Sequence, residues 1–548
     1  MHRRVAKFLS IITVCSIIVG CDGDKSGSNI IENNTTQQNE QTPYSYKGLQ
    51  FYYENLTPDS YKLEQLSDSE FNSLSKTQKL QVANNLLESL FFGYGFKDLE
   101  TKIDSGSFLS DIRASLEEDS IDRGALESYI LDSNNFVQYR DKTWARAQVL
   151  TILSRFYAMD KLDRYYLDNY IAYILTQTIM FSPAYELSST HMPDISRVYN
   201  RIVNMLDINS GMRYITYVHM MSEDNWRRFR SPEDNGREML EIFTLDTKDS
   251  DVPLAAKALQ NWRLNSDSDT LEVGLNKNTT PIKLFNTTIY TGEDFYRELV
   301  KSNSFTYGAT KRLVDFFFPL KSKAKKDEII KSIVSSNPQK WEDIILQILF
   351  SKEYLLHNKR ALSAEELFYS MAKKLKFRVK RDGFYSFRGK LSNMNQASMK
   401  YKLGKLKRVP LDSFSFATYH KFIREYLFLN IAELQESNKD SWRYDGWSEK
   451  ILETSNFTLD ETNHKAALRS FIKYLFLATI AREPNESEYT LFSSHMLNDG
   501  EFRDDFNILT RRDKNEEEER AKRRKNIALI VFDYISRLES TYMQKEVK

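Results

Sequence analysis

Glycine and proline are scarce in this sequence, at 18 and 11 of 548 residues. Because these residues form many turns, their scarcity favours long helices over a sandwich of many short strands. Charge of one sign is not in excess either, since 77 basic side chains stand against 76 acidic ones. A balanced chain has no overall field to gather nucleic acid, so we do not expect nucleic acid as a partner.

Cysteine is almost absent: Cys15 and Cys21 are the only two in the chain. A positively charged start precedes an apolar run over residues 8–19, which is too short to span a bilayer comfortably and is typical of a signal peptide. The Ile-Val-Gly-Cys quartet at residues 18–21 resembles the lipobox of bacterial lipoproteins. We therefore predict a lipoprotein signal peptide over residues 1–21, with lipid on Cys21; the alternatives are an uncleaved anchor or an ordinary secretory signal.

This prediction accounts for both thiols, because Cys15 leaves with the signal and Cys21 is acylated. Intrachain disulfides and thiol catalysis are then excluded from the folded body. Several fatty acyl chains, such as palmitate, would hold the protein stably to a membrane in the cell envelope, facing the periplasm. Asp22 resembles the residue that retains enteric lipoproteins in the inner membrane, so we favour that membrane over the outer one.

The rest of the chain predicts an all-α fold. Residues 22–46 are polar and predict a flexible tether. At this length we expect two packed multi-helix lobes with one small β-hairpin: a helical domain over residues 47–375, a basic hairpin or loop segment over 376–410 and a C-terminal helical lobe over 411–548. Apolar residues at helical spacing mark core faces in three blocks: Leu80, Val82, Leu86, Leu87, Leu90 and Phe91; Val149, Ile152, Leu153 and Phe156; Tyr170, Ile171, Ile174 and Leu175.

Local signals place several helix ends and one hairpin. Ser231 before Pro232 predicts an N-cap, and the pairs Ser363 with Glu366 and Asn485 with Glu488 are spaced like capping boxes. Asp382 and Gly383 lie between short aromatic and basic runs, which predicts a hairpin over residues 377–388. The charge run 516–525 and the amphipathic stretch 527–538 together predict one C-terminal helix, too short in its apolar part to be a second anchor.

Residues 231–262, reading SPEDNGREMLEIFTLDTKDSDVPLAAKALQNW, resemble the signature of the bacterial domain-of-unknown-function 1800 family. The matching positions are Asp224, Asn225, Arg237, Glu238, Glu241, Phe243, Thr244, Leu245, Ala255, Ala256, Ala258, Leu259 and Trp262. Pro232 and Asn235 depart from the family pattern, and its aromatic-rich histidine segment has no counterpart here. The segment from Leu475 is also similar to the close of the domain-of-unknown-function 1553 family. The resemblance covers about residues 80–375 and implies a helical, exported protein without naming a reaction.

One group of residues could carry acid/base chemistry. Arg237, Glu238 and Glu241 share a stripe of the predicted helix after Pro232, and paired carboxylates beside an arginine can form an acid/base or divalent-cation site. An envelope hydrolase would use Glu238 and Glu241 in a cleft beside Asp224 and Asn225. The favoured alternative is structural, with an Arg237–Glu241 helix pair, acids at the helix N-terminus or a buried polar network.

Other chemistry has little support. The seven histidines form no HExxH motif or close pair, so we expect no metal site, and His219 is predicted to pack on a helix. We also find no GxSxG elbow, P-loop or dinucleotide fingerprint, so no cofactor is predicted.

A basic segment over residues 373–408 carries a single acid, Asp382, and interleaved aromatic residues. It could bind anionic lipid headgroups or an acidic envelope polymer, or simply be a solvated face. Its candidate binding residues are Lys380, Arg381, Arg388, Lys402, Lys405 and Lys407. The sequence therefore predicts a membrane-anchored envelope lipoprotein that acts by binding or scaffolding, with the hydrolase as the alternative.

Overall fold

The computed structural model describes the following residues: 62–131, 145–180, 194–245, 247–265, 267–268, 270–376, 378–379, 387–389, 391, 394, 396, 413–424, 444–446, 449–453, 464–498 and 517–547. These residues are mostly helical, with a few short antiparallel strand pairs, so the predicted all-α class is confirmed. The predicted tether over residues 22–46 and the lipidated Cys21 lie outside the described residues.

The helices of the first half are α2 (Asp68–Ser73), α3 (Lys76–Ser89), α4 (Phe96–Ile103), α5 (Phe108–Ser115), α6 (Arg123–Leu131), α7 (Ala145–Ala158), α8 (Arg164–Thr178), α9 (Asp194–Asp207), α10 (Met212–Met220), α11 (Glu223–Arg228), α12 (Pro232–Phe243) and α13 (Asp251–Leu259). Those that follow are α14 (Gly292–Lys301), α15 (Asn303–Phe317), α16 (Lys323–Ser335), α17 (Trp341–Leu349), α18 (Lys352–Leu355), α19 (Ala364–Lys374), α21 (Ser413–Phe422), α23 (His464–Ile480), α24 (Glu486–Asn498) and α26 (Glu517–Ile535), with the 3-10 helices η2 (Glu449–Leu452) and η5 (Glu539–Thr541).

The strands are two to three residues long and pair antiparallel. The pairs are β1 (Trp262–Leu264) with β2 (Leu271–Val273), β3 (Ile282–Leu284) with β4 (Thr287–Ile289), β5 (Arg360–Ala361) with β8 (Met543–Gln544), and β6 (Arg378–Val379) with β7 (Tyr444–Gly446). The first two pairs are local hairpins, whereas the last two join segments that are distant in the sequence.

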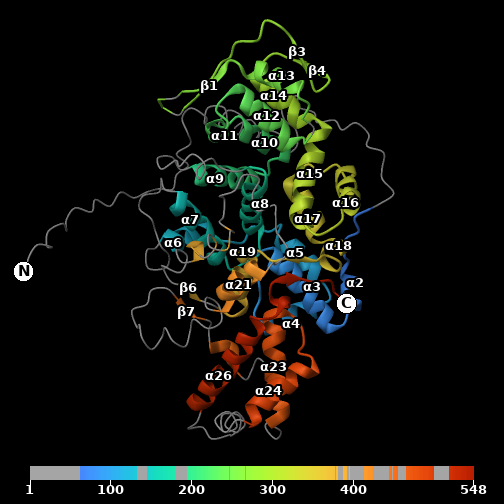
Figure 1. Ribbon diagram of the computed structural model, residues 1–548, viewed down its shortest axis with the longest axis vertical. Helices are drawn as coiled ribbons and strands as arrows, with labels where there is room; N and C mark the ends of the chain where they lie inside the picture. The colour runs from blue at the N-terminus through green and yellow to red at the C-terminus, as the bar shows by residue number, and fades with distance from the viewer. Residues whose placement is uncertain are drawn as a thin grey trace, which may run out of the picture.

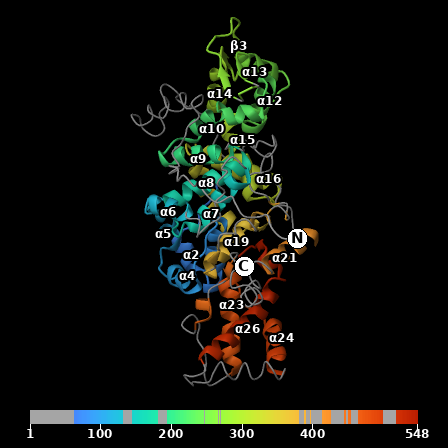
Figure 2. The ribbon, with the colours of Figure 1, turned by 90° about the vertical axis from the view of Figure 1, so that its left-hand side faces the viewer.

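The described elements form an elongated molecule (Figure 1). Helices α10 to α14 and strands β1 to β4 lie at one end, and α23, α24 and α26 lie at the other, with α19 near the middle. Helix α4, from the first part of the chain, lies beside α23, from the last part, in both views of the molecule (Figure 2). The Phe96 ring of α4 contacts the Tyr474 ring of α23, with 5.4 Å between the ring centroids.

Local sequence chemistry explains many of the helix ends. The Ser231 side chain accepts a hydrogen bond from the Asp234 amide, with Pro232 as the first helical residue of α12. Ser363 and Glu366 form a reciprocal capping box at α19, and Asn485 and Glu488 do the same at α24. These predicted caps are therefore confirmed, as is the C-terminal helix, which is α26.

The three predicted core faces are buried, and the apolar core that contains them is continuous from Leu63 to Tyr542. The turn of the hairpin predicted over residues 377–388 lies outside the described residues. Arg378 and Val379 form a strand as predicted, but this strand pairs with β7, and residues 387–389 are helical, so the predicted second strand is wrong at that end. The predicted segment boundaries at residues 376 and 410 stay predictions, because most residues between them lie outside the described part.

Candidate functional site

The predicted carboxylate stripe lies on the outer face of α12. Arg237 and Glu241 are exposed and Glu238 is half-buried. The neighbouring residues Met239 and Leu240 are buried in the core. The guanidinium of Arg237 pairs with Glu233 one turn earlier, at 3.1 Å. The predicted Arg237–Glu241 pair is therefore wrong: Arg237 pairs with Glu233, which lies at the same spacing of four residues but toward the N-terminus.

Asp224 and Asn225 lie on α11 and are buried. Asp224 accepts hydrogen bonds from Arg197 and Arg201 of α9, at 2.6 and 2.7 Å. Burial alone would raise the pKa of Asp224, but these two guanidinium groups hold it below its usual value. Asp224 is thus an ionised link between α9 and α11.

The structure does not bring the two halves of the predicted cleft together. The Asn225 side-chain nitrogen contacts the Met239 sulfur at 3.4 Å, so the inner face of α12 is packed against α11. Glu238 and Glu241 lie on the other side of α12. The acid/base arrangement predicted from the sequence therefore stays a prediction, with Asp224 already engaged by two arginine side chains.

His219 of α10 packs in the core, as predicted. It is 3% exposed, and its ring lies 6.5 Å from that of Phe243, centroid to centroid. Burial, with some repulsion from Arg201, lowers the pKa of His219 to about 3, so the imidazole is neutral at physiological pH.

The signature-like segment forms a packing unit. A Cβ atom at Gly236 would lie 2.8 Å from that of Ala255, so glycine allows α12 and α13 to approach closely. Trp226 stacks on Trp262 and donates a hydrogen bond to the Tyr296 hydroxyl, at 2.9 Å. These contacts explain the pattern of small and aromatic residues by packing rather than by chemistry.

The first basic residues of segment 373–408 are used in packing. Lys373 donates to the Met159 carbonyl oxygen at 2.7 Å, and burial lowers the pKa of Lys373 to about 8. Lys374 is buried beside Glu88. Arg388 is half-buried in a short helical turn. The other candidate binding residues, Lys380, Arg381, Lys402, Lys405 and Lys407, lie outside the described residues.

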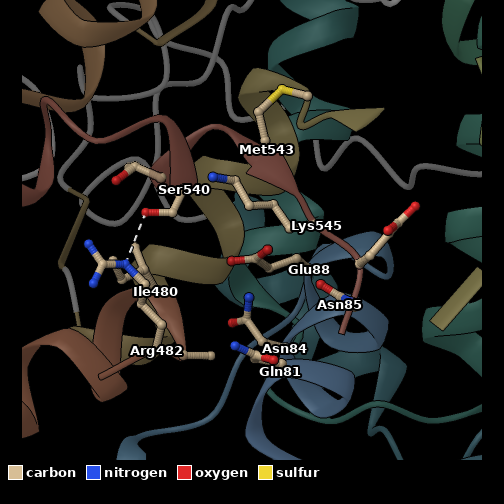
Figure 3. Close-up of a pocket in the computed structure, with 12 residues that line it drawn as sticks. Gln81, Asn84, Asn85, Glu88, Ile480, Arg482, Ser540, Met543 and Lys545 are labelled. Carbon is tan, nitrogen blue, oxygen red and sulfur yellow. Dashed lines mark hydrogen bonds between the residues drawn. The ribbon is translucent and has the colours of Figure 1, made fainter. Parts of the chain in front are cut away.

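A cavity that sequence reasoning missed lies where three distant segments meet (Figure 3). It is called the polar cavity below because most of the residues that line it have polar side chains. One wall is a stripe of α3 formed by Gln81, Asn84, Asn85 and Glu88, whose spacing of three and four residues places them on one helix face. The other walls are the end of α23 with the residues after it and the C-terminal segment: Ile480, Ala481, Arg482, Ser540, Thr541, Met543, Lys545 and Glu546. The cavity has a volume of about 70 Å³.

A buried ion pair supports the α3 wall. The Lys374 ammonium group of α19 donates to Glu88 at 2.9 Å, to the Thr479 carbonyl oxygen at 3.0 Å and to the Asn84 side-chain oxygen. Glu88 and Lys374 are 4% and 6% exposed. All three ammonium protons have acceptors, which compensates for the burial of the charge. Helices α3, α19 and α23 are thereby tied together at the cavity.

The C-terminal wall is held by a second buried network. Gln544 of β8 accepts a hydrogen bond from Arg360 at 2.7 Å and donates to the Tyr354 carbonyl oxygen at 2.9 Å. Arg360 in turn makes two hydrogen bonds to Glu366, at 2.9 and 2.8 Å. This bidentate geometry fixes the segment that carries Ser540 and the rest of the wall.

The chain matches no protein-family model, no curated protein and no solved structure. The resemblance to the domain-of-unknown-function 1800 and 1553 families thus stays a prediction. In the part of the chain that the structure describes, no group of three or more His, Cys, Asp or Glu side chains could hold a metal ion. Among those same residues, no helix is long and apolar enough to cross a membrane.

Proposed function

We propose that this protein is a bacterial envelope lipoprotein that acts by binding or scaffolding. The observation that carries the proposal is the Ile-Val-Gly-Cys quartet at residues 18–21, placed directly after a basic start and an apolar run. Cys21 would carry the lipid, and the polar residues 22–46 would tether the helical body to the membrane surface. Cysteine usage supports this proposal, because both cysteines of the chain lie within the predicted signal and lipobox.

The way the body uses its charged residues favours binding over catalysis. Asp224 and Lys374 are buried in ion pairs that link helices, and Arg360 of β5 is buried in an ion pair with Glu366 of α19. Glu238 and Glu241, the predicted acid and base, lie on the outer side of α12, away from Asp224. An acid/base pair needs convergent groups at a shared site, whereas Asp224, predicted to lie beside these carboxylates, is engaged by two arginine side chains.

Metabolic labelling tests the anchor. Cells producing the protein would be grown with labelled palmitate, alongside variants Cys21→Ser and Cys15→Ser. The proposal expects label in the parent and in Cys15→Ser, no label in Cys21→Ser, and release of Cys21→Ser from the membrane fraction. Equal labelling of the two variants, or none in the parent, would show that Cys21 is not lipidated.

The basic segment 373–408 is the proposed contact with an anionic partner, either lipid headgroups or an acidic envelope polymer. Since Lys373 and Lys374 are engaged in packing, the contact would use the later residues Lys402, Lys405 and Lys407. The protein should be retained on anionic vesicles at low salt and released at high salt. Replacing these three lysines by glutamine should weaken retention, whereas Lys545→Gln is the control. Unchanged retention of the triple variant would contradict this contact.

A further inference from the structure

The polar cavity between α3, α23 and the C-terminal segment is small. A water molecule takes up about 30 Å³ in the liquid, so about 70 Å³ corresponds to about two waters. Because Lys545 and Glu546 of its wall are exposed, the cavity opens to solvent. A small polyol or a sugar ring could therefore place one or two hydroxyl groups inside while the rest of the ligand stays in solvent.

The charged groups of the cavity are mostly matched by opposite charges. Glu88 pairs with Lys374 at 2.9 Å, and Lys545 pairs with Glu539 at 3.3 Å. Arg482 makes two hydrogen bonds to Glu488, at 2.8 and 2.7 Å. Three of the four charged lining residues, Glu88, Arg482 and Lys545, therefore have a partner of opposite charge. The fourth, Glu546, is exposed. A charged ligand would have to compete with these pairs, so the cavity favours a neutral one.

The remaining hydrogen-bonding capacity is that of amides and a hydroxyl group. Asn84 uses its oxygen for Lys374, and Asn85 uses its nitrogen for the Leu355 carbonyl oxygen at 3.1 Å. Within the described part of the chain, this leaves a donor on Asn84 and an acceptor on Asn85. Ser540 accepts from Arg482 at 3.4 Å, which leaves its O–H to donate (Figure 3).

The cavity therefore offers both hydrogen-bond donors and acceptors to a ligand. A hydroxyl group can bond to both, because its oxygen donates and accepts. The Met543 side chain adds an apolar surface for the C–H groups of a ligand. We propose that this cavity binds a neutral polyhydroxy compound, either a small polyol or a single sugar ring. The proposal specifies the binding role suggested above but does not depend on the lipid anchor or on the basic segment.

Saturation-transfer NMR on the purified full-length protein tests this proposal. The probes are glycerol, D-glucose and N-acetylglucosamine at millimolar concentration, with glucuronate and glucosamine as charged counterparts. We expect saturation transfer to at least one neutral probe and weaker transfer to its charged counterparts. The glycerol arm distinguishes an open-chain polyol from a sugar ring.

Variants of the wall locate the binding. Gln81 is half-buried, and its side chain makes no hydrogen bond among the described residues, so Gln81→Leu should fold, as circular dichroism would verify. Losing one neutral hydrogen bond should weaken binding about threefold to tenfold, and Ser540→Ala should act similarly. Lys79→Leu, which adds the same side chain to α3 outside the cavity, should bind like the parent.

Hydrogen exchange gives a second readout. A bound probe should slow amide exchange over residues 540–546, because these residues form one wall. Absence of transfer to every neutral probe would overturn the proposal, as would equal binding by the parent and Gln81→Leu, or equal binding of glucose and glucuronate. None of these results would alter palmitate labelling at Cys21, so this proposal and the lipoprotein proposal fail separately.

Discussion

Replacing Asp168 by asparagine should change how the stability of the protein depends on pH. Asp168 lies on α8 with no exposed surface, and its carboxylate is 3.0 Å from the Arg164 guanidinium. Arg164 also pairs with Glu342 of α17, at 2.5 Å. Burial raises the pKa of Asp168 from 3.8 to about 7, because Arg164, shared with a second acid, offsets only part of the desolvation.

The direction of the effect follows from proton linkage. Below about pH 4, Asp168 is protonated in both the folded and the unfolded chain. Between pH 4 and 7 the unfolded chain releases this proton first, so the free energy of unfolding falls as pH rises. A pKa difference of about three units corresponds to about 4 kcal/mol of free energy of unfolding. The parent has this contribution below pH 4 and has lost it above pH 7.

Asp168→Asn resembles the protonated acid and cannot ionise. Relative to the parent, its free energy of unfolding should therefore rise by about 2.5 kcal/mol between pH 5 and pH 8, because the parent has already lost part of the roughly 4 kcal/mol at pH 5. Urea unfolding followed by circular dichroism across this range measures the difference. Asp249→Asn, at an exposed position, is the control and should show no such trend. If Asp168→Asn is less stable than the parent at pH 8 by the same amount as at pH 5, attraction to Arg164 outweighs burial and the reasoning is refuted.

Three further predictions can be checked by denaturant unfolding. Gly236→Ala should destabilise the protein by about 1–3 kcal/mol, since its methyl group would clash with α13; an unchanged midpoint would contradict this close packing. Glu238→Gln with Glu241→Gln should change stability by less than about 0.5 kcal/mol, because both side chains lie on the outer face of α12, and a clearly lower midpoint would show that they bridge helices. Glu366→Gln should destabilise by about 3–5 kcal/mol, as it leaves the Arg360 charge buried without its partner; a loss below 1 kcal/mol would refute this.

Features set by a few neighbouring residues could be predicted from the sequence. The cap at Ser231 and the capping box of Asn485 with Glu488 depend only on residues three positions apart. Apolar residues at helical spacing likewise predicted which faces are buried. The C-terminal helix was recognisable because its apolar stretch follows the charge run without a helix breaker.

Features set by distant segments could not be predicted. The strand at Arg378 pairs with Tyr444–Gly446, more than sixty residues away, so the local hairpin signal was misleading. The hairpins at residues 262–289 have strands of only three residues, too short for an alternating pattern.

The polar cavity was missed for the same reason. The spacing of Gln81, Asn84, Asn85 and Glu88 is visible in the sequence, but their burial depends on Lys374 and on the C-terminal segment. A helical stripe likewise tells which residues share a face but not which face is buried, so the exposure of Arg237 and Glu241 could not be predicted from the sequence.

Mass spectrometry of the mature N-terminus tests the lipoprotein proposal most directly. The protein would be purified from the membrane fraction and its N-terminal peptide analysed intact. We expect a chain that begins at Cys21 and carries the added mass of fatty acyl groups on that residue. A chain that retains Met1, or a mature chain with an unmodified Cys21, would contradict the proposal.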